Sequence, residues 1–145
     1  MDQPEKLLTH VEFRCDLFPS YESEEEGVNF ETVWGKRLAE FLHGELRAEG
    51  FETEEPFAED WGWILPIAND RFSLWIGCGN YEEYPDGYLC FIHPDKPFVR
   101  RFFKKIDTRP RLTQLQRTLN KVLTTTPGIH DIKWWTHDEF MNPRR

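Results

Sequence analysis

Apolar and polar side chains alternate near the start of the chain, and this pattern predicts a half-buried strand over residues 10–17. One face carries apolar side chains and the other polar ones: Val11, Phe13, Cys15 and Leu17 against His10, Glu12, Arg14 and Asp16. Over residues 34–50 the apolar spacing becomes that of a helix with one buried stripe. Gly50 followed by Phe51 is typical of a glycine C-cap with its hydrophobic contact.

The central part of the chain is rich in β-branched and aromatic residues, which favour strands. We expect strands over residues 51–57, 61–68, 71–78 and 88–93. Asn69-Asp70 tolerates positive φ and predicts a two-residue hairpin turn between the second and third of these strands. In the strand over residues 61–68, alternation predicts that Trp61 and Trp63 lie on one face.

The pattern is helical again after Pro94. A short helix is expected over residues 98–106 and a firmer one over 108–126, followed by a last strand over 129–136 and a frayed tail over 142–145. The order β-α-β-β-β-β-α-β has too few helices for a parallel sheet. We therefore predict one α+β domain of residues 1–145. Its sheet is mainly antiparallel, with five or six strands, two or three helices on one face, and a split β-α-β arrangement.

Charge is unevenly divided along the chain. The net charge is −8, but residues 1–95 hold 22 acidic and 6 basic residues, while 96–145 hold 4 and 12. The acidic part favours a non-catalytic domain that presents an acidic surface to a basic protein partner, as toxin antidotes and regulatory binding proteins do. The residues expected on that surface are Glu22, Glu24, Glu25, Glu26, Glu52, Glu54 and Glu55.

An alternative function follows from the segment Glu59-Asp60-Trp61-Gly62-Trp63. Indole faces and carboxylates together can hold a cationic small molecule in a pocket. The candidate residues are Glu59, Asp60, Trp61, Trp63, Trp75, Tyr88 and His93. An aromatic core stripe that follows a solvated acidic turn explains the same residues and is favoured, because aromatic side chains most often simply pack; the pocket stays open as the alternative.

A third hypothesis concerns the basic residues of segment 96–121. Cations alternate there with phenylalanines, as they do in grooves that bind single-stranded nucleic acid: Lys96, Arg100, Arg101, Lys104, Lys105, Arg109 and Arg111 with Phe98, Phe102 and Phe103. Two features argue against it. The rest of the chain is acidic, and the phenylalanine spacing would let these rings anchor a helix to the sheet.

The sequence contains no motif of a common enzyme class, such as a Gly-x-Ser-x-Gly elbow, a Gly-rich phosphate loop or His-Glu-x-x-His. We predict no catalytic residue and no cofactor. Cys90 and His93 fall on opposite faces of a strand and cannot share a metal. The acidic and histidine group near the C-terminus is expected to be solvated: His130, His137, Asp138 and Glu139.

The expected location is the cytosol. Residues 1–8 have no apolar run behind a basic start, and no stretch approaches the about 18 apolar residues of a membrane span, so we expect no membrane partner. The three cysteines, Cys15, Cys78 and Cys90, are widely spaced within apolar stretches. We expect them to be buried, reduced thiols.

Overall fold

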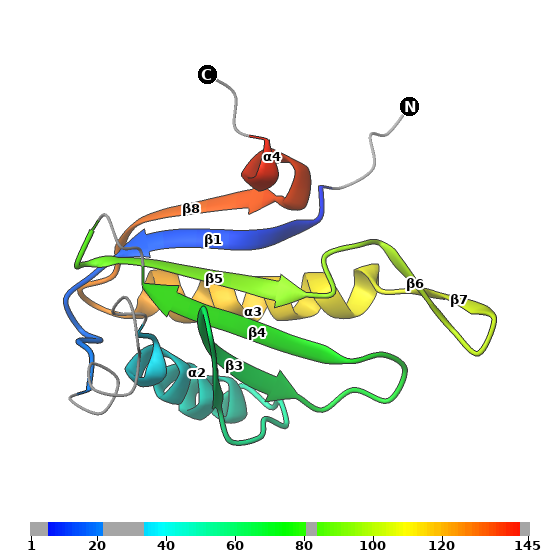
Figure 1. Cartoon of the computed structure of the whole chain (residues 1–145), viewed down its shortest axis with the longest axis horizontal. Helices are drawn as coiled ribbons and strands as arrows, with labels where there is room; N and C mark the ends of the chain where they lie inside the picture. Colours follow the sequence, from blue (N-terminus) through cyan, green and yellow to red (C-terminus); the bar gives the residue numbers. More distant parts are fainter. Residues whose placement is uncertain (1–5, 22–33, 81–83, 143–145) are drawn as a thin grey trace.

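The computed structural model describes residues 6–21, 34–80 and 84–142. In these parts of the chain, strands and helices follow one another as Figure 1 shows. The strands are β1 (Leu8–Arg14), β2 (Phe57–Glu59), β3 (Gly62–Ile67), β4 (Leu74–Asn80), β5 (Gly87–His93), β6 (Phe98–Arg101), β7 (Lys104–Asp107) and β8 (His130–Thr136). The helices are α2 (Lys36–Ala48), α3 (Arg109–Thr125) and α4 (His137–Met141).

Six strands form one antiparallel sheet in the order β2-β3-β4-β5-β1-β8, and β6 and β7 form a separate hairpin. Both β5 and β8 run antiparallel to β1, which lies between them, so these two strands are parallel to each other. The chain passes from β5 to β8 through α3. This is a split β-α-β unit, and the α+β fold predicted from the sequence is confirmed.

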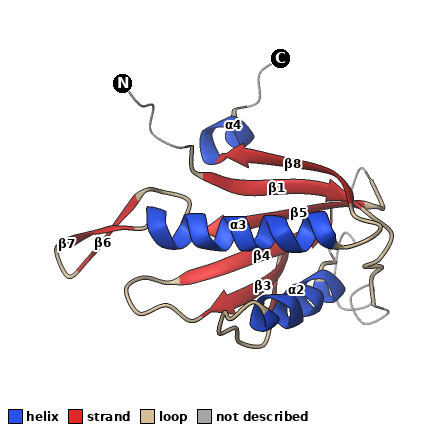
Figure 2. Cartoon of the chain, turned by 180° about the vertical axis from the view of Figure 1, so that it is seen from behind, coloured by secondary structure: helices blue, strands red, loops and turns tan. Residues whose placement is uncertain are grey.

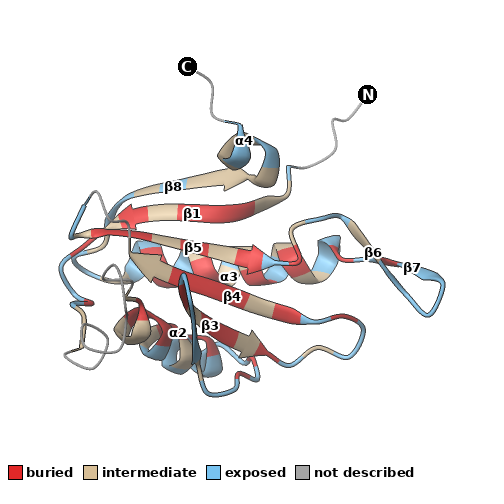
Figure 3. Cartoon of the chain, in the orientation of Figure 1, coloured by how far each residue is buried: buried red, intermediate tan, exposed pale blue. Residues whose placement is uncertain are grey.

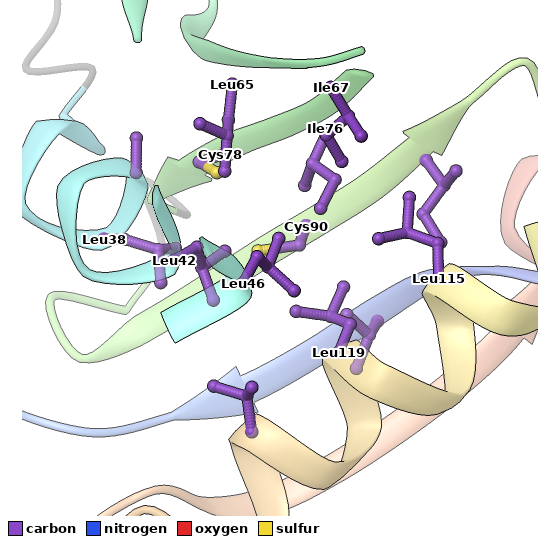
Figure 4. Packing of buried hydrophobic residues seen from close by; sticks show 14 of the residues in the cluster. Leu38, Leu42, Leu46, Leu65, Ile67, Ile76, Cys78, Cys90, Leu115 and Leu119 are labelled. Atoms are coloured by element: carbon purple, nitrogen blue, oxygen red, sulfur yellow. The ribbon is translucent and has the colours of Figure 1, made fainter. Parts of the chain in front are cut away.

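Helices α2 and α3 lie on the same side of the sheet (Figure 2). Their apolar stripes are fully buried against the inward side chains of the strands, with Leu42 and Leu119 among them (Figure 4). Cys78 and Cys90 belong to this core, and all three cysteines are free and buried, as predicted. None of the described helices is both long enough and apolar enough to cross a membrane.

The ends of α2 show why glycine occurs there. Gly35 precedes the helix and packs against β4 so closely that a Cβ atom would lie 2.6 Å from the carbonyl oxygen of Cys78. At the other end, Gly50 has a φ of 99°, and the amide of Phe51 donates to the carbonyl of Leu46 at 3.0 Å. The glycine C-cap predicted from the sequence is confirmed.

The predicted helix over residues 98–106 is wrong, because this segment forms the β6–β7 hairpin. Val99 pairs with Ile106, and Ile106 is buried against the rest of the protein. Phe102 and Phe103 occupy the turn and are 80% and 101% exposed, so they do not anchor a helix to the sheet. In Figure 3 the hairpin extends from the body of the molecule as a largely exposed arm.

Two further boundaries differ from the prediction. The link between β3 and β4 is not a two-residue turn, since β3 ends at Ile67 and β4 begins at Leu74. The side-chain amide of Asn69 donates to the carbonyl of Phe72 and closes this longer loop. Of the strand expected over residues 51–57, Thr53 forms only an isolated bridge to Ile67, and the strand itself lies at Phe57–Glu59.

Candidate functional site

One face of the sheet is left uncovered by α2 and α3, and we call it the open face. The alternation and register of the strands place aromatic and charged side chains on it. They are His10, Glu12 and Arg14 of β1, Phe91 and His93 of β5, Trp75 of β4, and Lys133 and Trp135 of β8. Helix α4 lies at the β8 edge of the sheet (Figure 1), and its Phe140 stacks on His10 with ring centroids 4.6 Å apart.

An aromatic cluster lies in the middle of the open face and consists of Trp61, Trp75, Phe91 and His93. The ring of Trp61 lies 5.1 Å from that of Phe91, and the ring of Trp75 stacks on His93 at 4.7 Å. Gly77 makes room for them, because a Cβ atom there would lie 2.4 Å from the Phe91 ring and 2.9 Å from Trp61. A cavity of about 280 Å³ adjoins the cluster.

A second group, which we call the His–Asp–His cluster, consists of His10, Asp95 and His137. One ligand atom from each, two imidazole nitrogens and a carboxylate oxygen, lie within 4.8 Å of one another. His10 comes from β1, Asp95 from the segment after β5, and His137 from the start of α4. The pairing of β1 with both β5 and β8 brings these three segments together.

His10 is the buried member of this cluster, with 5% of its surface exposed. Its ring stacks between Phe140 and Phe91. Its Nδ1 shares a hydrogen bond of 2.9 Å with the hydroxyl of Thr9, which leaves Nε2 for another partner. Burial lowers the pKa of His10; the nearby Asp95 carboxylate acts in the opposite direction, and His137 lowers it further. The neutral imidazole that can ligate a metal is therefore favoured.

Asp95 and His137 form the exposed side of the cluster, with 23% and 41% of their side chains exposed. Nδ1 of His137 lies 2.6 Å from Oδ2 of Asp95. This nitrogen is buried and lies within ion-pair distance of the carboxylate, although it forms no hydrogen bond among the described residues. A cation shared by the two groups would hold their ligand atoms about 3.4 Å apart, so the partly exposed side chains would have to rotate away from each other to bind it.

The position of His137 is set by the start of α4. Thr136 and Glu139 form a capping box: the amide of Glu139 donates to the Thr136 hydroxyl at 3.1 Å, and the amide of Thr136 donates to the Glu139 carboxylate at 2.9 Å. These hydrogen bonds fix the first turn, where His137 is the first helical residue. They hold the imidazole over β1.

A charged recess of about 650 Å³ lies beside the His–Asp–His cluster, between β1, β8 and α4. Glu12, Lys133 and Trp135 line it from the strands, and Glu139 and Phe140 from the helix. Glu12 pairs with Lys133 across the strands. The recess shares β1 and Phe140 with His10, so a molecule held there would lie close to the cluster.

The pocket predicted from the sequence is only partly assembled. Trp61, Trp75 and His93 come together in the aromatic cluster. Trp63 packs on the core at the helix-covered side, and Tyr88 is buried with its hydroxyl donating to the carbonyl of Phe18. The prediction that Trp61 and Trp63 share a face is therefore wrong. Trp61 precedes β3, and the turn at residues 60–61 carries its ring to the opposite side.

The predicted charged residues are exposed or lie outside the described residues. Glu59 is paired with Gly62 at the β2–β3 turn, and it is exposed, as is Asp60. Glu52, Glu54 and Glu55 are exposed as well. Of the acidic surface, Glu22, Glu24, Glu25 and Glu26 lie outside the residues that the structure describes.

His10 and Asp95 are the candidate residues that sequence reasoning missed. His10 is one of several polar residues on an alternating strand, and Asp95 follows the end of another. The histidines and acids near the C-terminus do not gather, since His130 contacts Asp131 and only His137 joins the cluster. Their convergence depends on strand order, for which the sequence carries no local signal. Comparisons with family models, with curated proteins and with solved structures find no match for this chain.

Proposed function

We propose that the protein binds a divalent transition-metal ion through His10, Asp95 and His137. The observation that carries this proposal is the convergence of two imidazoles and one carboxylate from three distant segments, with ligand atoms within 4.8 Å of one another. Imidazole nitrogen and carboxylate oxygen are ligands that Zn²⁺ and Fe²⁺ accept in proteins. Ca²⁺ and Mg²⁺ prefer oxygen ligands, so this set disfavours them.

The geometry requires little rearrangement to hold such an ion. Ligand atoms at about 2.0–2.1 Å from a tetrahedral zinc are about 3.4 Å from one another. Asp95 and His137 are already closer than that, and their partly exposed side chains can rotate apart. His10 is held by Thr9 and by two stacked rings. This outer hydrogen bond fixes the ring orientation, as the outer partners of metal-bound histidines do.

Three protein ligands leave at least one position of the ion open. Closed structural zinc sites use four protein ligands, whereas sites that bind an exchangeable water or ligand use three. The exposed side of the cluster is formed by Asp95 and His137, so the open position is on the side that solvent reaches. The proposed function is therefore the binding of a metal ion together with an exchangeable ligand on the open face.

The test is a titration of the metal-free chain with Zn²⁺ in competition with a chromophoric chelator. The wild-type chain is expected to bind one Zn²⁺. Loss of an outer partner alone weakens metal sites by about 10–100-fold, so His137→Gln or Asp95→Asn is expected to weaken binding by at least about tenfold. His130→Gln and Asp138→Asn are matched controls, because both residues are exposed near β8 and α4 but outside the cluster.

Two results would overturn the proposal. One is an affinity for Zn²⁺ that His137→Gln and Asp95→Asn leave unchanged. The other is an affinity that is lost with His130→Gln or Asp138→Asn instead, which would place the ion elsewhere. Circular dichroism of each variant establishes that it is folded before its affinity is compared.

We propose, as a second function, that an acidic segment over residues 52–60 docks on a basic protein partner. The observation that favours it is exposure: Glu52, Glu54, Glu55, Glu59 and Asp60 are all exposed. Within the described residues none of them forms an ion pair. Uncompensated acidic surface accelerates and orients association with a positively charged partner.

This second function is tested by affinity capture with wild-type bait and with bait carrying Glu52→Lys, Glu54→Lys and Glu55→Lys. The expected partner is basic, is retained at low salt, and is lost both at high salt and with the charge-reversed bait. A partner that the charge-reversed bait still retains would contradict docking through this segment. Zn²⁺ binding by the same bait serves as the control for an intact fold.

A further inference from the structure

The tip of the β6–β7 hairpin is the most exposed apolar feature in the described part of the chain. Phe102 and Phe103 are 80% and 101% exposed, so their rings have almost no neighbours. They form the two-residue turn between Arg101 and Lys104, which pair with each other across the hairpin. Figure 1 shows this hairpin projecting beyond the sheet and α3, so the two rings are at the end of a protruding arm.

The backbone of this turn does not suit its residues. Phe102 has a φ of 52° and Phe103 a φ of 65°. Two consecutive positive φ angles form the tight turn that asparagine and glycine favour, whereas bulky side chains disfavour the left-handed region. An aromatic pair here stabilises neither the turn nor the core. Residues that break a local rule without an internal benefit are expected at functional positions.

The cations around the turn break a second rule. Arg101 lies directly opposite Lys104, and Arg100 lies opposite Lys105. Like charges directly opposite each other in an antiparallel pair are destabilising. Asp107, the acidic residue of this hairpin, is engaged by Arg109 at 2.9 Å. The four cations next to the tip therefore have no acidic partner within the hairpin, and an external anionic surface would supply one.

We propose that the tip of the β6–β7 hairpin inserts Phe102 and Phe103 into the interface of an anionic phospholipid bilayer. Aromatic rings and apolar tips partition into the headgroup region of a bilayer, and flanking arginines and lysines contact lipid phosphates. Each basic residue near an anionic membrane adds to the attraction. The tip has this order along its axis: two rings at the end, and four cations immediately behind them.

The shape of the tip favours a bilayer over a nucleic acid strand. Single-stranded nucleic acid is bound in grooves, where aromatic residues line a path along the backbone. Phe102 and Phe103 instead protrude from a tight turn, with 80% and 101% of their surface exposed, and neither lines any of the four cavities described for this structure. A protrusion needs a partner that it can enter, and a fluid interface is such a partner.

The acidic average of the chain does not prevent this contact. Each strand of the hairpin has four residues, which span about 13 Å at about 3.3 Å per residue. Charges in solution are screened over about 10 Å at moderate ionic strength. The electrostatic interaction between the tip and a membrane therefore depends mainly on the positive charge of the tip itself. The expectation of no membrane partner rested on the absence of an apolar stretch long enough to span a bilayer, and a hairpin tip that enters only the interface needs no such stretch.

The experiment is co-sedimentation of the full chain with vesicles of phosphatidylcholine alone, or of equimolar phosphatidylcholine and phosphatidylglycerol. Binding is expected only with the anionic vesicles and is expected to weaken as salt rises. Phe102→Asn with Phe103→Gly removes both rings and supplies the residues that the turn favours, so the hairpin stays folded. This variant is expected to reduce the bound-to-free ratio by at least about tenfold, since burial of one phenylalanine is worth that much.

Matched controls separate the tip from the rest of the surface. Phe57→Asn removes another exposed phenylalanine and is expected to leave vesicle binding unchanged. Lys104→Gln with Lys105→Gln is expected to lower the bound-to-free ratio by about 30-fold, at about 1 kcal/mol for each lysine. Arg71→Gln removes an exposed cation outside the hairpin and is expected to change it little.

Four results would overturn the proposal. The first two are absence of binding to anionic vesicles, and binding that Phe102→Asn with Phe103→Gly leaves intact. The third is binding of a single-stranded oligonucleotide by a chain that does not bind vesicles, which would mean that the basic hairpin binds nucleic acid. The fourth is sedimentation of the chain in the absence of vesicles, if Phe102→Asn with Phe103→Gly abolishes it. This would mean that the tip contacts a second copy of the chain.

Discussion

Nδ1 of His137 and Oδ2 of Asp95 lie 2.6 Å apart, at the distance of an ion pair, and Nδ1 forms no hydrogen bond among the described residues. A buried polar atom without a hydrogen bond costs about 1–3 kcal/mol. A cation placed between the imidazole, the carboxylate and Nε2 of His10 would remove this cost, because it would bind all three atoms. The contact between His137 and Asp95 is therefore the feature that a bound ion would change most, since the two ligand atoms would move apart to about 3.4 Å.

Metal binding is expected to stabilise the folded chain. A ligand that binds only the native state at 100 times its dissociation constant adds about 2.7 kcal/mol to the free energy of unfolding. Zn²⁺ at that excess is expected to raise the melting temperature of the wild-type chain by more than that of Asp95→Asn, which binds the ion more weakly, as measured by differential scanning calorimetry. An equal increase in both proteins would show that the ion binds elsewhere.

The stability of the metal-free chain is expected to fall as the pH is lowered. Burial holds the pKa of His10 below its unfolded value of about 6.5, so the unfolded chain takes up a proton first. The stability that His10 contributes is thus present above that value and is lost as the pH falls through the folded pKa. His10→Phe keeps the stacked ring and removes the titration.

Chemical denaturation in the presence of a chelator, between about pH 5 and pH 7, measures this effect. Asp95 and His137, the titratable groups that face His10, are present in both proteins. The free energy of unfolding is expected to depend less steeply on pH in His10→Phe than in the wild type. Parallel curves for the two proteins would contradict the assignment of this titration to His10.

Gly77 and Gly44 are expected to respond to alanine with opposite signs. A Cβ atom at Gly77 would lie 2.4 Å from the Phe91 ring, so Gly77→Ala should displace the aromatic cluster and lower stability by about 1–3 kcal/mol. Gly44 has no heavy atom within 4 Å of the same position and lies inside α2, so Gly44→Ala should raise stability by about 0.5–1 kcal/mol. Urea denaturation of both variants decides this, and a neutral Gly77→Ala would be incompatible with the packing described.

The turn at Phe102 and Phe103 is expected to reduce the stability of the hairpin. Non-glycine residues in the left-handed region cost about 1–3 kcal/mol each. Phe102→Asn with Phe103→Gly should therefore raise the free energy of unfolding by at least about 1 kcal/mol, whereas alanine at both positions should give no such gain. Thermal denaturation compares the two variants. Equal stability of both would mean that the turn accepts its phenylalanines without strain.

The antiparallel sheet and its two covering helices could be predicted because apolar residues recur in each element at the spacing of a strand or of a helix. The stripe from Leu38 to Leu46 and the alternation from Val11 to Cys15 both predict the buried face correctly. Residues 98–106 were misassigned because phenylalanines at helical spacing also occur in a hairpin, where Phe102 and Phe103 point to solvent. No local pattern predicts that two aromatic residues occupy a turn that disfavours them.

The candidate site could not be derived in the same way. Its members are far apart in the chain, and the register of β1 against β5 and β8 decides whether His10 faces Asp95 and His137. Trp61 illustrates the same limit, because a turn before β3 sends its ring to the face opposite Trp63. The residue types and their alternation could be read along the chain, but which polar and aromatic side chains lie close together in space could not.

The most direct test of the metal site is X-ray absorption spectroscopy of the chain loaded with one equivalent of Zn²⁺. The account predicts two imidazole nitrogens, one carboxylate oxygen and at least one further oxygen ligand, at about 2.0–2.2 Å from the ion. Spectra of His137→Gln should lose one imidazole. Sulfur at about 2.3 Å, which would implicate Cys78 or Cys90, or a spectrum without imidazole would contradict it.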